Sequence, residues 1–172
     1  MIYLKWFLLL PVYFFSVLCA WLVSPIAPLF AHDYSLKGTW LWWATTPNTD
    51  LRGDPDHQKR WHYKNSYLQQ VAWVWRNPAV NFQREHLGVH VEPTDTVVTK
   101  GDPDAQETQG VMFQRVLRED RTIAWMLYAY LPYRHIFKGK AFRAIFGWKT
   151  WDAHIKDPLQ MAFRVTLFKS IR

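Results

Sequence analysis

Two copies of one short turn carry residue types that acid–base or metal chemistry needs. Gly-Asp-Pro-Asp occurs at residues 53–56 and at residues 101–104. Paired carboxylates bind hard cations or act as general acid and base, but Asp-Pro also begins ordinary turns, because Asp accepts bonds from nearby N–H groups. Hard cations take about six or more oxygen ligands and neither copy has EF-hand spacing, so we favour turns. The candidate carboxylates of a metal-dependent enzyme are Asp54, Asp56, Asp102 and Asp104.

Histidine spacing is a second candidate for metal chemistry. His86 and His90 are four residues apart, but Gly88 is expected to end the helix between them, and the intervening Glu of a zincin is missing. We expect these histidines, with His57 and His62, to be exposed or half-buried. The sequence has no Walker A loop, dinucleotide fingerprint or nucleophile elbow. We therefore predict no enzymatic activity, no metal and no cofactor.

The positive charge of the chain is unevenly distributed. Residues 1–113 hold 9 Lys and Arg against 10 Asp and Glu, whereas residues 114–172 hold 12 against 4, which is a net charge of +8. Basic residues alternate with aromatic ones at 133–140, a pattern that suits anionic lipid headgroups or single-stranded nucleic acid, and also an ordinary solvated surface. The candidates for a basic face are Arg134, Lys138, Lys140, Arg143 and Lys149.

The start of the chain is the strongest feature of the sequence. Residues 6–31 are 26 consecutive positions without a charge, directly after Lys5. Roughly 20 apolar residues in a helix match a hydrocarbon core about 30 Å thick. A cleaved signal peptide has a shorter apolar region and small residues at its cleavage site, where this chain has Leu29. A helix in a soluble core is rarely apolar on every side. The run therefore predicts an uncleaved transmembrane anchor over residues 1–31, with its spanning part ending near Ser24.

Aromatic residues flank this predicted anchor. Amphipathic rings favour the headgroup layer, and ordinary burial in a protein core is the alternative. The membrane-interface candidates are Trp6, Trp40, Trp42 and Trp43. Lys5 on one side and Lys37 on the other differ too little in charge to decide which side of the membrane the rest of the chain occupies.

The remaining residues predict one α+β domain. Residues 32–60 carry turn signals and are expected to form a juxtamembrane loop. Apolar residues at three- and four-residue steps predict a helix over residues 61–76. Asn77 as the N-cap, with Pro78 in the first helical position and Gly88 as the stop, predicts a second short helix, so that helices fill 61–87.

From residue 89 the apolar period changes from 3.6 to two, which predicts strands within residues 89–168. Residues 122–130 are apolar on both faces, as a central strand requires. Hairpin turns are expected at residues 118–121 and around Gly139. The predicted fold is an N-terminal transmembrane helix followed by two helices packed on an antiparallel β-meander, in one domain over residues 61–172. The expected strands are 89–92, 96–99, 111–118, 122–130, 140–149 and 161–168.

Several short motifs occur in order along the chain: Leu-Lys-Trp at 4–6, Thr-Pro-Asn at 46–48 with Leu51 and Gly-Asp at 53–54, Trp-Arg-Asn-Pro-Ala at 75–79, and Gly-Trp-Lys at 147–149. Together they resemble a family of small uncharacterised membrane proteins from tailed phages and prophages. The resemblance implies a phage or prophage origin and a single-pass protein of the host inner membrane. The family carries no assigned activity, so the resemblance transfers no site residue.

Three functions follow from these features. The first is a nonenzymatic interaction module that contacts the bilayer and a host or phage membrane protein, with host takeover or superinfection exclusion as its role. The second is a membrane-tethered nucleic-acid-binding protein, which the C-terminal charge favours. The third is a metal-dependent enzyme that uses the Asp-Pro-Asp turns.

Overall fold

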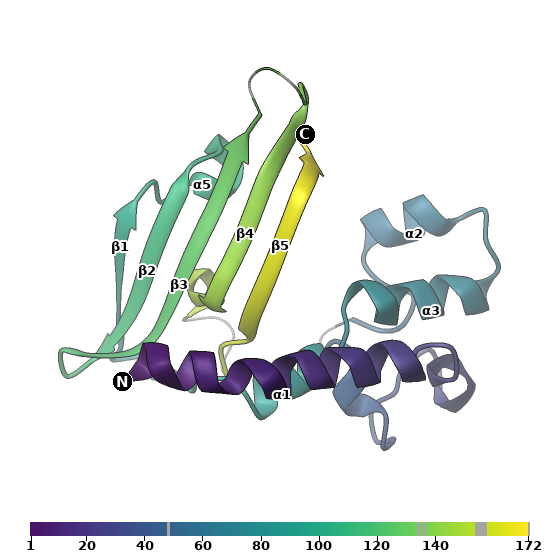
Figure 1. Cartoon of the computed structure of the whole chain (residues 1–172). Coiled ribbons are helices and arrows are strands. Elements are labelled where there is room, and N and C mark those ends of the chain that lie inside the picture. The colour runs from purple at the N-terminus through teal and green to yellow at the C-terminus, as the bar shows by residue number, and fades with distance from the viewer. Residues whose placement is uncertain (48, 134, 136, 154–157, 172) are drawn as a thin grey trace. The chain divides into compact units, whose positions relative to one another are not determined.

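The computed structural model describes residues 1–47, 49–133, 135, 137–153 and 158–171 of the chain (Figure 1). The chain divides into two compact units, which we name the sheet unit (Met1–Leu8 with Gly88–Arg172) and the helical unit (Leu9–Leu87). One long helix, α1 (Ile2–Val23), gives its first two turns to the sheet unit and the remainder to the helical unit.

The sheet unit contains a five-stranded antiparallel meander in which each strand pairs with the next along the chain (Figure 1). This confirms the predicted α+β class and the meander. Val89 forms only an isolated bridge with Leu159, so the strand expected at 89–92 is wrong. The strands are β1 (Thr96–Gly101), β2 (Val111–Arg118), β3 (Arg121–Pro132), β4 (Lys140–Trp148) and β5 (Met161–Ser170).

Strand β3 lies at the centre of the sheet, as its apolar residues on both faces predict. Its Met126, Tyr128 and Tyr130 belong to the core on one face, which the short helix α5 (Ala105–Thr108) joins through Ala105. The predicted hairpin at residues 118–121 is confirmed. Glu119 and Asp120 take φ values of 48° and 63°, which is the positive-φ pair that a tight two-residue hairpin requires.

An ion-pair cluster holds the segment before β1 against β2. The Arg118 guanidinium donates from Nε and Nη2 to the two carboxylate oxygens of Asp95, each at 2.8 Å, and Nη1 lies 2.8 Å from Glu92 Oε1. The side chain of Asp95 is 1% exposed, so the two hydrogen bonds from the Arg118 guanidinium stabilise its buried negative charge. Asp95 in turn raises the pKa of Arg118.

The helix predicted over residues 61–76 is present but begins at Ser66, and a separate short helix precedes it. Helix α2 runs over Pro55–Trp61 and helix α3 over Ser66–Arg76. The break arises because Asn65 takes an extended conformation and its side chain accepts from Leu68 N, which starts a new helix. Asp54 begins α2 by accepting from His57 N at 2.7 Å. The predicted loop over residues 32–60 therefore contains most of α2.

Asn77 ends a helix, although the sequence predicts that it begins one. Its backbone N–H donates to the carbonyls of Trp73 and Val74, and its side-chain amide donates to Trp73 O at 3.3 Å, so both donors close α3. Helix α4 (Val80–Glu85) starts after Ala79, which takes the left-handed conformation (φ 54°). It ends before the predicted stop at Gly88.

The core of the helical unit is small and mostly aliphatic. Its buried side chains come from α3 and from the connection between α1 and α2, which includes the 3₁₀ turns η1 (Ala27–Phe30) and η2 (Trp42–Ala44). The cluster consists of Ala27, Leu36, Leu41, Leu51, Trp73 and Val74. The expectation that helices cover the sheet concerns the placement of one unit against the other and stays a prediction.

Gly147 in β4 lies where a side chain would meet the backbone of β3. Its φ is 103°, and a Cβ at this position would lie 2.1 Å from the carbonyl oxygen of Trp125 on β3. Gly139 also has a positive φ (76°), but a Cβ there would meet nothing within 4 Å. A comparison of alanine variants at the two glycines therefore separates the free-energy cost of a positive φ from that of a steric clash.

We predict that Gly147→Ala destabilises the protein much more than Gly139→Ala. Gly139→Ala bears only the strain of a positive φ, about 1 kcal/mol, whereas Gly147→Ala adds a steric clash of roughly 2 to 3 kcal/mol. Chemical denaturation of the detergent-purified variants measures both values. Equal losses for the two variants would contradict the close approach of β4 to β3.

Candidate functional site

Helix α1 has one side covered by protein and one side exposed. Trp6, Ser16 and Ala20 are buried, and they fall on one side of a helix with 3.6 residues per turn. On the other side, large apolar residues recur at three- and four-residue steps with exposed fractions between 51% and 71%. We name this set the exposed side of α1, and it consists of Leu4, Phe7, Leu8, Phe15, Leu18 and Leu22.

Such a surface is unusual for a protein in water. Scattered apolar residues are normal on a surface, but continuous apolar patches of this kind mark sites of contact with a membrane or another protein. Helix α1 is the one helix among the described residues that is long and apolar enough to cross a membrane. The exposed side of α1 is therefore the candidate functional site.

The apolar surface continues past the end of α1. Ile26, Leu29 and Phe30 are exposed, and the ring of Phe30 lies edge-on to that of Trp40 with centroids 5.8 Å apart. Trp40 itself is 62% exposed. Ile26, Leu29 and Phe30 directly follow Ser24, near which the spanning part of the predicted anchor ends.

The four membrane-interface candidates have different surroundings. Trp40 is exposed, whereas Trp42 and Trp43 are half-buried within the helical unit. Trp42 packs against the core cluster of this unit, and Trp43 lies edge-on to Phe82 with centroids 6.5 Å apart. Of these three residues, Trp40 presents the most indole surface to a headgroup layer.

The fourth candidate, Trp6, is buried in the sheet unit with an exposed fraction of 8%. Its indole N–H donates to the carbonyl oxygen of Gly147 at 3.1 Å. Its ring lies edge-on to Trp125 at 5.3 Å and stacks on Phe163 at 6.2 Å between centroids. An interfacial position for Trp6 does not fit this burial, because both its polar group and its ring are engaged by protein. Sequence reasoning missed this contact because its partners lie more than a hundred positions away.

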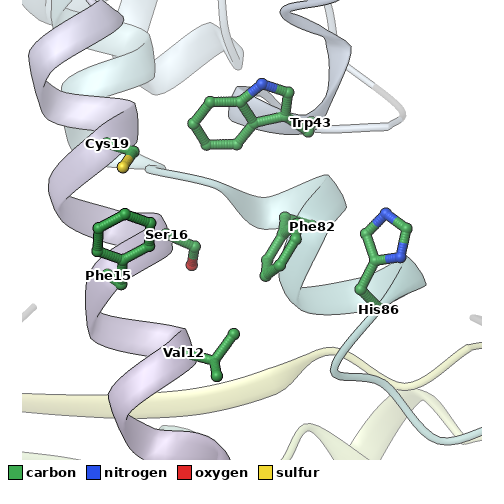
Figure 2. A pocket seen from close by; sticks show the side chains of 7 residues that line it. All are labelled: Val12, Phe15, Ser16, Cys19, Trp43, Phe82 and His86. Carbon is green, nitrogen blue, oxygen red and sulfur yellow. The ribbon is translucent and has the colours of Figure 1, made fainter.

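An apolar pocket of about 370 Å³ lies beside α1 in the helical unit (Figure 2). Residues of α1 form one wall, and residues of η2 and the α4 region form the opposite wall. The size is at the lower end of the range for small-molecule sites, and the lining lacks the convergent polar groups of a catalytic pocket. It suits an apolar chain. The lining residues are Val12, Phe15, Ser16, Cys19, Trp43, Phe82 and His86.

The predicted basic face is not a uniform cationic surface. Lys138 is exposed, but Lys140 Nζ donates to Ser170 Oγ at 2.9 Å and Lys149 Nζ to Gln160 Oε1 at 2.6 Å. Arg143 is half-buried, with its guanidinium 5.6 Å from the centre of the Tyr128 ring. Arg134 lies outside the described residues. Three of the four described cations are thus partly taken up by contacts within the sheet unit.

The carboxylates of the two Asp-Pro-Asp turns bind local groups. Asp54 accepts from His57 N and lies 3.4 Å from Arg76 Nη1. Asp102 accepts from the N–H of Asp104 at 2.9 Å and from the hydroxyl of Thr108. Within the described parts of the chain, no three His, Cys, Asp or Glu side chains converge on a metal position. The geometry is that of capping and turn formation.

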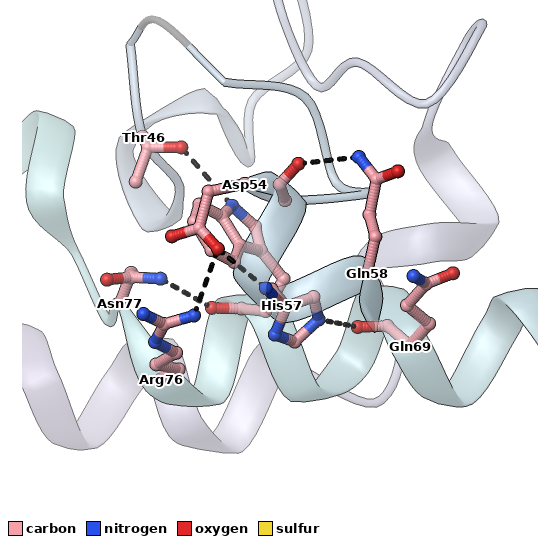
Figure 3. A network of polar contacts seen from close by, with 9 residues as sticks. Thr46, Asp54, His57, Gln58, Gln69, Arg76 and Asn77 are labelled. Atoms are coloured by element: carbon pink, nitrogen blue, oxygen red, sulfur yellow. Dashed lines mark hydrogen bonds and ion pairs between the residues drawn. The ribbon is translucent and has the colours of Figure 1, made fainter. Parts of the chain in front are cut away.

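His57 is fully buried, although the sequence predicts an exposed or half-buried ring. Its Nε2 lies 2.9 Å from the carbonyl oxygen of Gln69, so Nε2 carries the proton and donates it (Figure 3). Its Nδ1 is buried without a hydrogen-bond partner among the described residues. The rings of Trp61 and Trp73 lie 6.0 and 5.1 Å from it between centroids. The ring therefore ties α2 to α3 and is inaccessible to a substrate.

The model of a family of unknown function, DUF7338, matches residues 1–172. The chain belongs to this family. No curated protein and no solved structure matches the chain. The family has no assigned activity, so the comparison adds no function to the exposed side of α1.

The buried imidazole predicts a pH dependence of stability. Burial lowers the pKa of His57, with the Gln69 carbonyl opposing this shift, so the unfolded chain takes up the proton more readily. The contribution of neutral His57 to the free energy of unfolding is fully present above the unfolded pKa of about 6.5. It is lost as the pH drops towards the folded pKa, by up to about 1.4 kcal/mol per pH unit. We expect His57→Gln to flatten the dependence of the melting temperature on pH between about 7 and 5.

His62→Gln is the matched control, because His62 is exposed on the segment that follows α2. This variant is expected to keep the pH dependence of the unaltered protein. The readout is the slope, so a general loss of stability in His57→Gln does not obscure it. Identical slopes for His57→Gln and the unaltered protein would contradict a neutral, buried His57.

Proposed function

We propose that this protein attaches to a membrane through the exposed side of α1 and acts there as a nonenzymatic binding module. One observation carries the proposal: an apolar helix surface is left uncovered along the whole length of α1. Burying a large apolar side chain gives roughly 1.5 to 3 kcal/mol, so six of them supply on the order of 10 kcal/mol for transfer into hydrocarbon. A bilayer offers this environment over a length that matches the helix.

The net charge of +7 supports an anionic membrane as the partner. The resemblance to phage and prophage membrane proteins points to the host inner membrane, reached either by a single crossing of α1 or by attachment at one surface. Both arrangements bury the exposed side of α1. In this setting host takeover or exclusion of a competing phage needs only a protein that holds a partner at the membrane.

Two observations favour binding over catalysis. The turn carboxylates Asp54 and Asp102 accept hydrogen bonds that shape the chain locally, and His57 is enclosed by protein. A nucleic-acid-binding role is the weaker alternative. The +8 charge of residues 114–172 favours it, but Lys140 and Lys149 donate to neighbouring side chains and Arg143 is half-buried.

The attachment is tested with the full chain, purified in detergent and reconstituted with vesicles of phosphatidylethanolamine and phosphatidylglycerol. We predict that it floats with the vesicles and that the double variant Phe15→Glu/Leu18→Glu loses most of this binding. Each carboxylate costs on the order of 1 to 3 kcal/mol to bring into apolar surroundings, so partitioning falls at least roughly tenfold.

Val98→Glu is the control, because Val98 is also an exposed apolar residue (37%) but lies on the edge strand β1. It is expected to float as the unaltered protein does. If the double variant floats equally well, or if the unaltered chain does not float, α1 is not a membrane anchor.

A further inference from the structure

The first turns of α1 are part of the same folded unit as the C-terminal sheet. Tyr3 lies 5.2 Å from Trp125 between ring centroids, and Trp6 donates its indole proton to Gly147, 141 positions further along the chain. Both contacts lie within the sheet unit. Residues near the N-terminus are therefore packed against residues of β3 and β4.

This packing is incompatible with a crossing by α1. A transmembrane α1 places residues 1–5 on one side of a hydrocarbon core about 30 Å thick and everything after residue 31 on the other. The sheet residues Trp125 and Gly147 would then lie across the bilayer from the turn that carries Trp6. Its indole N–H would lose a buried acceptor and face hydrocarbon or headgroups instead. The same chain cannot have both the folded sheet unit and a crossing α1.

We infer that α1 lies in the plane of a single leaflet, with its exposed side in the hydrocarbon and the N-terminus on the same side as the sheet. This inference rests on the membrane attachment proposed above. In-plane helices usually combine an apolar side with a charged side of their own. Here α1 is apolar all round after Lys5, and the protein that covers Trp6 in the sheet unit and Ala20 in the helical unit takes the place of the polar side.

The helical unit provides independent support. Ala20 is fully buried in a cluster with Ala44 and Ala79, and the indole N–H of Trp21 donates to the carbonyl of Trp75 at 3.1 Å. Protein of the helical unit thus covers the later turns of α1 on the side of Ala20. A crossing helix would carry this cover into the bilayer, whereas an in-plane helix keeps it outside.

Charge and aromatic placement fit a lipid occupant. Lys5, exposed near the start of α1, can extend its ammonium to phosphate while its stem follows the apolar surface. Tyr3 and Trp21 are partly exposed, at 46% and 39%, beside the most exposed residues of the helix. Rings in this position match the boundary between headgroups and acyl chains. The net charge of +7 opposes pairing of two copies and favours an anionic lipid surface.

The two chain ends provide the first test. Protease-cleavable epitope tags are placed before Met1 and after Arg172, and protease is added to sealed spheroplasts and to inverted membrane vesicles from cells producing the full chain. We expect both tags to be cut in the same preparation and protected in the other. Cutting of the N-terminal tag in one preparation and the C-terminal tag in the other would show a crossing and overturn the inference.

Depth measurements provide the second test. Leu4, Phe15 and Leu22 all belong to the exposed side of α1, and Leu4 and Leu22 are separated by about five turns. Each is replaced by a spin-labelled cysteine in a Cys19→Ser background. An in-plane helix places the three labels at one depth, about 5 to 10 Å below the headgroups. A crossing helix places the Phe15 label about 10 Å or more deeper than the Leu22 label, which would refute an in-plane α1.

These outcomes separate the two proposals. If the chain does not float with vesicles, membrane attachment itself is wrong. If it floats but the tags lie on opposite sides, attachment stands and the in-plane position is wrong.

The control for the depth measurement is a Lys100→Cys label on β1, which is exposed and distant from α1 in sequence. It gives the spin-label reading expected for a position outside the bilayer.

Discussion

The burial of Trp6 against the sheet is the constraint on which the arrangement of this chain depends. The indole N–H of Trp6 donates to the carbonyl oxygen of Gly147, a residue at which a Cβ would clash with the backbone of Trp125 on β3. Within the sheet unit, the contact fixes which side of the first turns of α1 faces the protein. Leu4, Phe7 and Leu8, on the opposite side of these turns, are exposed.

The sheet can be predicted from the sequence because the patterns that indicate it are local and repeated. Apolar residues with period two recur in β4 and β5, and a two-residue turn at Glu119 and Asp120 fixes one hairpin. The helix ends are harder to read, because several polar residues compete for the same roles. Asn77 is a suitable N-cap by type, yet the carbonyls of Trp73 and Val74 are within its reach and draw it to the end of α3.

Unlike the sheet, the exposed side of α1 could not be predicted from the sequence. Because α1 is apolar on all sides, no periodicity in its residues distinguishes the covered side from the exposed one. Trp6 and Trp40 are the same residue type on either side of the predicted anchor, but one is 8% exposed and the other 62%. Only their tertiary partners separate a core residue from a surface one, and those partners are distant in sequence.

Because protein covers part of α1, the length of its apolar run does not by itself imply that the helix crosses a membrane. Length and composition establish that a helix can match the thickness of a bilayer, but they do not require it to stand across one. In the proposed attachment, folded protein holds the early turn with Trp6 and the later turn with Ala20, so the helix would insert only as far as its exposed side allows. The proposed depth of insertion then depends on tertiary packing, and the folded protein would supply the polar surroundings that an interfacial helix usually carries in its own sequence.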